Sequence, residues 1–366
     1  MTGLYIHIPF CIKKCNYCDF NSQSGNEALY SDYVDCIKKE IEQTKNNGII
    51  FDSVYIGGGT PTVLPSALLS SIMKSITNVK RDAEITVEAN PKTADYEKLS
   101  SLLASGVNRL SLGLQSVNDS ELKMLGRAHS FSDFEETFFA ARRAGFKNIS
   151  TDLMFALPNQ TLKIWENTLK KAVSYKPAHI SAYCLKIEKG TPFEKMKLNL
   201  PNDDTAADMY DLCTDILESH GYKRYEISNF AKDNKESFHN NLYWKTQDYI
   251  GIGAGAHSCF GGKRFSKICD IKKYIDAIKS GESAVENLIT LSQKDKISEF
   301  VFLGLRMTSG ISENEFTARF NTDIDSVFGK QLKKYENLGV IIRRSGKIFI
   351  NPKFLYVSNS ILSDFV

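Results

Sequence analysis

The sequence lacks any long hydrophobic segment. No apolar run approaches the roughly 20 residues that a membrane-spanning helix needs. It also lacks a charge imbalance, because 46 Lys and Arg residues stand against 43 Asp and Glu residues, a formal net charge of +3. A balance this close to neutrality offers no electrostatic argument for a nucleic-acid or membrane-surface partner. No signal-peptide pattern precedes the first apolar run, Leu4–Ile8, so we expect a cytoplasmic protein.

The sequence also lacks the pattern of a disulfide framework. Eight cysteines in an intracellular chain of 366 residues do not indicate one. Five of them are scattered, and a scattered free cysteine typically is a small buried apolar residue; these are Cys36, Cys184, Cys213, Cys259 and Cys269. The remaining three, Cys11, Cys15 and Cys18, form one cluster close to the first apolar run.

Short β-branched runs alternate with longer amphipathic stretches over the first 220 residues. The pattern predicts strands at 4–8, 53–57, 84–88, 109–114, 149–154 and 179–185, with helices near 27–46, 65–77, 95–104, 132–144, 161–174 and 204–219. Such alternation indicates an α/β fold with a parallel sheet and crossover helices. Six units are fewer than the eight of a full TIM barrel, so we predict a partial (β/α)6 TIM-like barrel, with its working face at the C-terminal ends of the strands.

The pattern changes after about residue 220. Two segments, 226–230 and 249–257, indicate further strands or Gly-rich close-packed chain. From about residue 293 the pattern is helical, with one helix at 324–338, and the runs 340–343 and 347–350 predict a hairpin that turns at Ser345-Gly346. We therefore expect a core barrel at 1–225, a connecting segment at 226–290, and a mostly helical, winged-helix-like domain at 291–366.

The cysteine cluster has the spacing C-x3-C-x2-C. Thiolates are soft ligands that suit iron–sulfur clusters and zinc. Three thiolates hold three irons of a [4Fe-4S] cube and leave the fourth iron open, where the amine and carboxylate of an amino acid could chelate. The alternative is a structural zinc site, which needs four protein ligands. No second cysteine pair exists, and His7 is the nearest candidate for a fourth ligand.

Polar and glycine residues stand at the ends of the expected strands. Gly57-Gly58-Gly59-Thr60-Pro61 follows the second strand, and glycines there let a ligand approach the backbone closely. Each later strand contributes one side chain, namely Glu88, Gln115 and Asp152. The ends of parallel strands converge, so these side chains predict one binding pocket; taken singly, each is typical of a solvated loop.

The cysteine motif resembles that of the radical S-adenosyl-L-methionine (SAM) superfamily. Nearly the whole chain is similar to the oxygen-independent coproporphyrinogen III oxidase (HemN) family, through the segments YIHIPFC from Tyr5, GGGTPT from Gly57, EANP from Glu88, GLQS from Gly113, DLMFALP from Asp152 and YIGIG from Tyr249. The resemblance implies that Tyr5, Gly58 and Glu88 contact a cluster-bound SAM. It also implies a second SAM site, lined by Gly59, Thr60, Gln115, Arg127 and Asp152. Cys184 and His257 match positions that contact SAM through the backbone.

Two features differ from the oxidases. The oxidases have a fourth cysteine where this sequence has Phe20, and they have an N-terminal extension over the active site that we expect to be absent here. Both differences match the family of heme chaperones called HemW, as does His239-Asn-Asn-Leu-Tyr-Trp244, which fits that family's H-N-x-x-Y-W pattern. The resemblance implies heme binding near His239, Tyr243 and Trp244. An imidazole is a good axial ligand for heme iron, and the two aromatic rings could stack on a porphyrin. The alternatives are that the aromatics are core or interface residues, that His239 caps a helix, and that His257 is the ligand.

The leading hypothesis is therefore a heme chaperone that holds a [4Fe-4S] cluster with SAM and passes heme to an apo-protein. The alternative is an oxidase that decarboxylates coproporphyrinogen III. The expected partners are heme and an acceptor apo-protein, for which a respiratory enzyme is one candidate. We expect no nucleic acid and no more than peripheral membrane contact through the acceptor, and a homodimer is one candidate assembly.

Overall fold

Six parallel strands form the centre of a twelve-stranded sheet in the computed structural model, which describes residues 1–366. They are β1 Thr2–Ile8, β2 Phe51–Gly58, β3 Val79–Ala89, β4 Arg109–Gln115, β5 Asn148–Phe155 and β6 His179–Cys184. Each strand pairs in parallel with the next one in the chain. The predicted parallel α/β architecture is confirmed.

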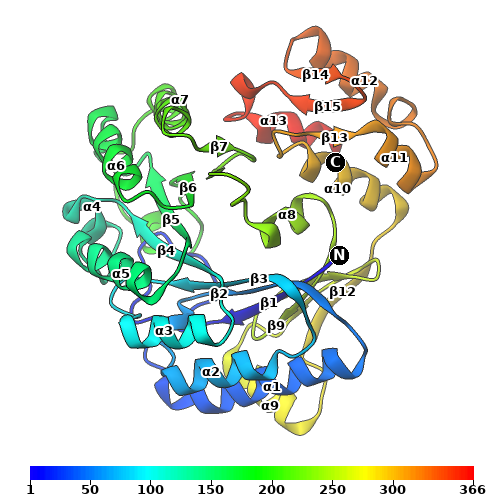
Figure 1. Ribbon diagram of the computed structural model, residues 1–366. Coiled ribbons are helices and arrows are strands. Elements are labelled where there is room, and N and C mark those ends of the chain that lie inside the picture. Colours follow the sequence, from blue (N-terminus) through cyan, green and yellow to red (C-terminus); the bar gives the residue numbers. More distant parts are fainter.

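The connections between these strands run through helices on the outer face of the curved sheet (Figure 1). These are α1 Tyr30–Asn46, α2 Ser66–Ser75, α3 Tyr96–Ala104, α4 Asp119–Met124, α5 Phe131–Ala144 and α6 Leu162–Ser174, and α7 Asp203–Ser219 follows β6. Local sequence sets their ends. In α5, for example, Ser130 and Asp133 form a capping box at the start, and Gly145 ends the helix with φ of 109°. No helix of the chain has the length and apolarity to cross a membrane.

Strands from residues 223–290, which include the expected connecting segment 226–290, extend the sheet at both edges. Strand β9 Asp248–Ile252 pairs in parallel with β1, and β10 His257–Phe260, β11 Lys263–Lys267 and β12 Val285–Thr290 continue outward in antiparallel order. At the other edge, β8 Asn229–Ala231 and β7 Lys223–Arg224 follow β6. Helix α9 Ile271–Ser280 packs beside α1. The antiparallel strands β10 to β12 were not anticipated from the sequence.

The H-N-x-x-Y-W segment forms a short helix, α8 Phe238–Trp244, which contacts β1 and β2 on one side and α10 on the other. Helices α10 Gln293–Gly304, α11 Glu313–Phe320 and α12 Ile324–Asn337 then precede the hairpin of β14 Ile341–Arg344 and β15 Lys347–Ile350. The predicted turn is present, since Ser345 and Gly346 both have positive φ. The two-residue strand β13 Ile311–Ser312 completes this small sheet, and α13 Ser358–Leu362 follows. Figure 1 shows this helical part beside the inner side of the main sheet.

Candidate functional site

A cavity of about 490 Å³ lies at the C-terminal ends of the parallel strands, and all three clustered cysteines line it. Cys11, Cys15 and Cys18 stand on the loop that follows β1. Two backbone hydrogen bonds hold this loop closed, from Cys11 N to Gln23 O at 2.9 Å and from Gln23 N to Pro9 O at 2.8 Å. The loop therefore presents its three thiols to one space.

The arrangement of the thiols fits a cluster better than a single metal ion. All three cysteines are free, and no three His, Cys, Asp or Glu side chains of the chain are placed to hold one ion. A structural zinc ion gathers four ligands at bonding distance, whereas a cluster holds its cysteines on separate irons. Burial raises the pKa of the thiols of Cys11 and Cys18. Metal binding opposes this effect, because a coordinating thiol is deprotonated.

The glycine turn after β2 lies directly against the cysteine loop. Gly59 N donates to Ile8 O at 2.8 Å, and a Cβ at Gly59 would lie 2.6 Å from Phe10 O. Gly58 has φ of 110°, and a Cβ there would lie 2.5 Å from the His7 ring. Side chains are therefore excluded at both positions, which leaves backbone groups and Thr60 beside Cys11. The Thr60 Oγ1 lies 3.7 Å from the Cys11 sulfur.

Glu88 supplies a half-buried carboxyl at the end of β3. Its Oε1 accepts a hydrogen bond from the Tyr55 hydroxyl at 2.7 Å, and its Oε2 accepts one from Gly58 N at 3.2 Å. Burial raises the pKa of Glu88 to about 7, with the nearby Asp152 adding to the shift. A buried carboxyl that faces a cavity is a good site for an amine, since a cationic ligand favours its ionised form. The amino-acid end of SAM has such an amine.

The other expected SAM residues reach the same cavity from neighbouring strands. Gln115, Arg127 and Asp152 all line it. Arg127 donates from Nη2 to Gly113 O at 2.8 Å, and its Nη1 lies 3.6 Å from the Cys15 sulfur. Burial raises the pKa of the Asp152 carboxyl. All the residues expected for the cluster and SAM line this cavity except Tyr5 and His257. Tyr5 shares a 2.9 Å hydrogen bond with His7 Nδ1.

Several residues of this cavity escaped the sequence analysis. Asn90 donates to Thr60 Oγ1 at 2.7 Å and accepts from Arg127, so it links the turn after β2 to the segment after α4. The sequence feature that could have identified Asn90 is its position two residues after Glu88, at the end of the same strand. Tyr183 at the end of β6 donates to Gln115 Oε1 at 2.8 Å. Of the two weaker expectations, Cys184 lines the cavity, whereas His257 is exposed at the start of β10 and does not line it.

The three residues expected to bind heme do not line the cysteine cavity. His239 is fully buried, its Nδ1 bonded to Ser53 Oγ and its Nε2 to Tyr243 Oη, both at 2.8 Å. In this conformation neither ring nitrogen is free to bind iron. It does not cap the helix either, because Ser237 does so. The ring of Trp244 packs under the guanidinium of Arg306, in the C-terminal helical part, with 4.6 Å from Arg306 Cζ to the ring centre.

Comparison with known proteins extends this picture along the whole chain. Residues 5–172 match the family model of the radical SAM superfamily, and residues 291–353 match that of the HemN C-terminal domain. The chain is 37% identical to heme chaperone HemW of Bacillus subtilis, over 100% of this chain and 99% of that protein. It is 34% identical to heme chaperone HemW of Lactococcus lactis, over 100% of this chain and 97% of that protein.

Two further similarities place these relatives in context. A mitochondrial radical SAM domain-containing protein 1 of Danio rerio is 34% identical over 92% of this chain and 80% of its own length. Among solved structures, coproporphyrinogen III oxidase (HemN) of Escherichia coli matches with a TM-score of 0.88 over 100% of this chain and 89% of that chain. At 24% identity the latter match shows a shared fold. Together with the cysteine cavity, the full-length similarities show that this chain belongs to the heme chaperone HemW family of radical SAM proteins.

Proposed function

We propose that this protein is a heme chaperone, which binds heme, holds a [4Fe-4S] cluster with SAM, and delivers the heme to an apo-protein. The observation that carries the proposal is the 37% identity to heme chaperone HemW over the whole chain. The cysteine cavity supports it, because the residues expected for the cluster and SAM line one space. We place this transfer in the cytoplasm, with a respiratory enzyme as a candidate acceptor.

The roles of the cavity residues follow from their placement. Cys11, Cys15 and Cys18 supply three thiolates to the cluster, which provides one-electron chemistry when bound. Glu88 holds the ammonium of SAM, and the backbone at Gly58 and Gly59 lets the amino-acid end approach. Arg127 lies beside Cys15, with its Nη1 3.6 Å from the sulfur.

The experiment that tests the proposal is a heme transfer assay. Anaerobically reconstituted protein is titrated with hemin, freed of excess heme, and mixed with an apo-form of a b-type cytochrome. A chaperone transfers heme in a collision, so the transfer rate should rise with acceptor concentration. A rate that does not depend on the acceptor would reflect passive release and would contradict delivery. Absence of hemin binding would refute the proposal altogether.

A parallel assay addresses the oxidase alternative. The fold shared with the oxidase does not favour that activity, because one fold supports many functions. Phe20, which stands in place of the oxidases' fourth cysteine, is 63% exposed at the cavity. We expect reduced protein with SAM and coproporphyrinogen III to yield no protoporphyrinogen. Formation of that product would establish the oxidase reaction instead.

A further inference from the structure

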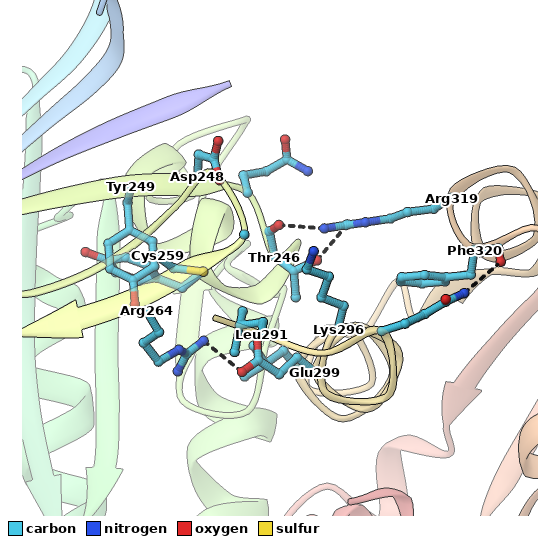
Figure 2. Close-up of a pocket in the computed structure, with 15 residues that line it drawn as sticks. Thr246, Asp248, Tyr249, Cys259, Arg264, Leu291, Lys296, Glu299, Arg319 and Phe320 are labelled. Atoms are coloured by element: carbon cyan, nitrogen blue, oxygen red, sulfur yellow. Dashed lines mark hydrogen bonds and ion pairs between the residues drawn. The ribbon is translucent and has the colours of Figure 1, made fainter. Parts of the chain in front are cut away.

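A second cavity, of about 580 Å³, lies between the antiparallel edge of the sheet and the C-terminal helices. Figure 2 shows Tyr249, Cys259 and Arg264 together on one side and Arg319 and Phe320 on the opposite side. The cavity shares no lining residue with the cysteine cavity. Its volume lies within the range of roughly 300–1,000 Å³ that is typical of small-molecule sites.

The lining of this cavity combines apolar rings and chains with charged groups, three cations against the two carboxylates of Asp248 and Glu299. The apolar part includes Tyr243, Tyr249, Leu291, Leu303 and Phe320. Three cations line the same space, and Arg264 is paired with Glu299 at 3.0 Å. The other two have no carboxylate partner: Lys296 makes no ion pair, and the guanidinium of Arg319 bonds only neutral oxygens of Lys245 and Thr246.

The two unpaired cations are also placed at the mouth of the cavity. Lys296 and Arg319 are exposed, whereas Tyr249 and Cys259 are half-buried and Phe320 is buried. A ligand that fits this arrangement has an apolar body for the buried interior and two carboxylates for the exposed mouth. At the mouth, the carboxylates can make charge-assisted hydrogen bonds to the cations without being fully desolvated. Heme has this form, because its two propionates project from one edge of a flat apolar ring.

The cavity also contains a residue that can ligate iron. Cys259 on β10 lines it and lies opposite Arg264 on β11. Cysteine thiolate is an established axial ligand of heme iron. Burial raises the pKa of the Cys259 thiol, and the positive charge of Arg264 opposes that effect. On coordination the thiol proton passes to solvent. No histidine lines this cavity, so an imidazole ligand is excluded there without a rearrangement.

The H-N-x-x-Y-W segment reaches this cavity through its tyrosine. Tyr243 lines it and packs edge-on against Tyr249, with 4.6 Å between the ring centres. The hydroxyl of Tyr243 is held by His239 at 2.8 Å. The segment therefore lies beside the cavity. In this arrangement His239 positions Tyr243 and is not the iron ligand.

We propose that heme binds in this second cavity, with its iron facing Cys259 and its propionates at Lys296 and Arg319. The inference rests on the proposed function, because it names the heme site of that chaperone.

The test is hemin titration of the full chain with matched variants. Cys259→Ala should shift the Soret band and weaken hemin binding about tenfold or more, while Cys269→Ala, a change at an exposed cysteine outside the cavity, should do neither. Lys296→Glu should also weaken binding, unlike Lys294→Glu on the same exposed turn of α10. Because Lys296 is exposed, Lys296→Glu should fold normally. Circular dichroism checks the folding of this variant and of Cys259→Ala.

The outcomes separate this inference from the proposed function. Wild-type protein that binds no hemin would refute the chaperone function itself. Wild-type binding that is unchanged in Cys259→Ala and Lys296→Glu would overturn the site and leave the function standing. Binding that is lost in Cys15→Ser, yet retained in the cavity variants, would place heme at the cysteine cavity and would likewise overturn this inference.

Discussion

The Nε2 atom of His239 lies 2.8 Å from the hydroxyl oxygen of Tyr243, four residues further along α8. The Nδ1 atom of the same ring lies 2.8 Å from Ser53 Oγ on β2. Burial lowers the pKa of His239 to about 3, and the positive charge of Arg109 adds to this. The ring is therefore neutral at physiological pH and links the sheet to α8 through two hydroxyl groups.

Replacement of His239 by Ala should therefore destabilise the fold. The change leaves a void and removes the hydrogen-bond partner of two hydroxyls, that of the buried Ser53 and that of the half-buried Tyr243, so the free energy of unfolding should fall by about 2–4 kcal/mol. Hemin binding should weaken as well, because Tyr243 loses its fixed position. Urea unfolding and hemin titration on one sample measure both effects, with the exposed His220→Ala as control. Unchanged stability with a lost Soret band would instead identify His239 as the iron ligand.

Replacement of Trp244 by Ala should loosen the contact between α8 and the C-terminal helices. The Arg306 guanidinium stacks on the Trp244 ring, and loss of this half-buried ring should cost on the order of 2 kcal/mol. Arg306→Ala should cost a similar amount, and the double variant should lose less than the sum, because both changes remove one interaction. Thermal unfolding measures these differences. Fully additive losses would show that the two side chains do not interact.

Periodicity in the sequence was enough to predict β1 to β6 and their crossover helices, because strands buried on both faces and amphipathic helices have distinct patterns. The gathering of the residues expected for the cluster and SAM at one cavity could be predicted because strand ends converge in a parallel sheet. The second cavity could not be predicted. It depends on β10 and β11 pairing beside β9, and on the side chains of Lys296 in α10 and Arg319 in α11, which come later in the chain. The sequence could not show that both ring nitrogens of His239 are hydrogen-bonded, because partners distant in sequence, such as Ser53, decide whether a ring is free.

Glu88 predicts a specific pH dependence of stability in protein without SAM. Its pKa is raised from 4.5 to about 7 in the folded chain. The folded state then binds more protons than the unfolded state between these values, so stability falls as pH rises through this window and levels off above it. The loss attributable to Glu88 is on the order of 3 kcal/mol.

Comparison with Glu88→Gln isolates this contribution. The variant has no ionisable group at the position, so its free energy of unfolding should fall less than that of the wild type between about pH 5 and pH 7.5. Urea unfolding at the two pH values measures the difference. Glu88→Gln should also weaken SAM binding, because a neutral amide does not attract an ammonium group. Identical pH profiles for the two proteins would show that Glu88 titrates at its ordinary value.

The three clustered cysteines should be necessary for the iron–sulfur cluster, and the other cysteines should not. Anaerobic reconstitution should give about four irons per chain, and Cys11→Ser, Cys15→Ser or Cys18→Ser should abolish the visible absorption of the cluster. Cys36→Ser and Cys213→Ser are the matched controls, because these buried cysteines lie in α1 and α7 away from the cavity. Cys184 is the stricter control. It lines the same cavity, but its thiol lies 3.6 Å from Leu185 O, to which it donates. Cluster loss in Cys184→Ser equal to that in Cys15→Ser would mean that a fourth thiolate occupies the iron which we leave open for SAM.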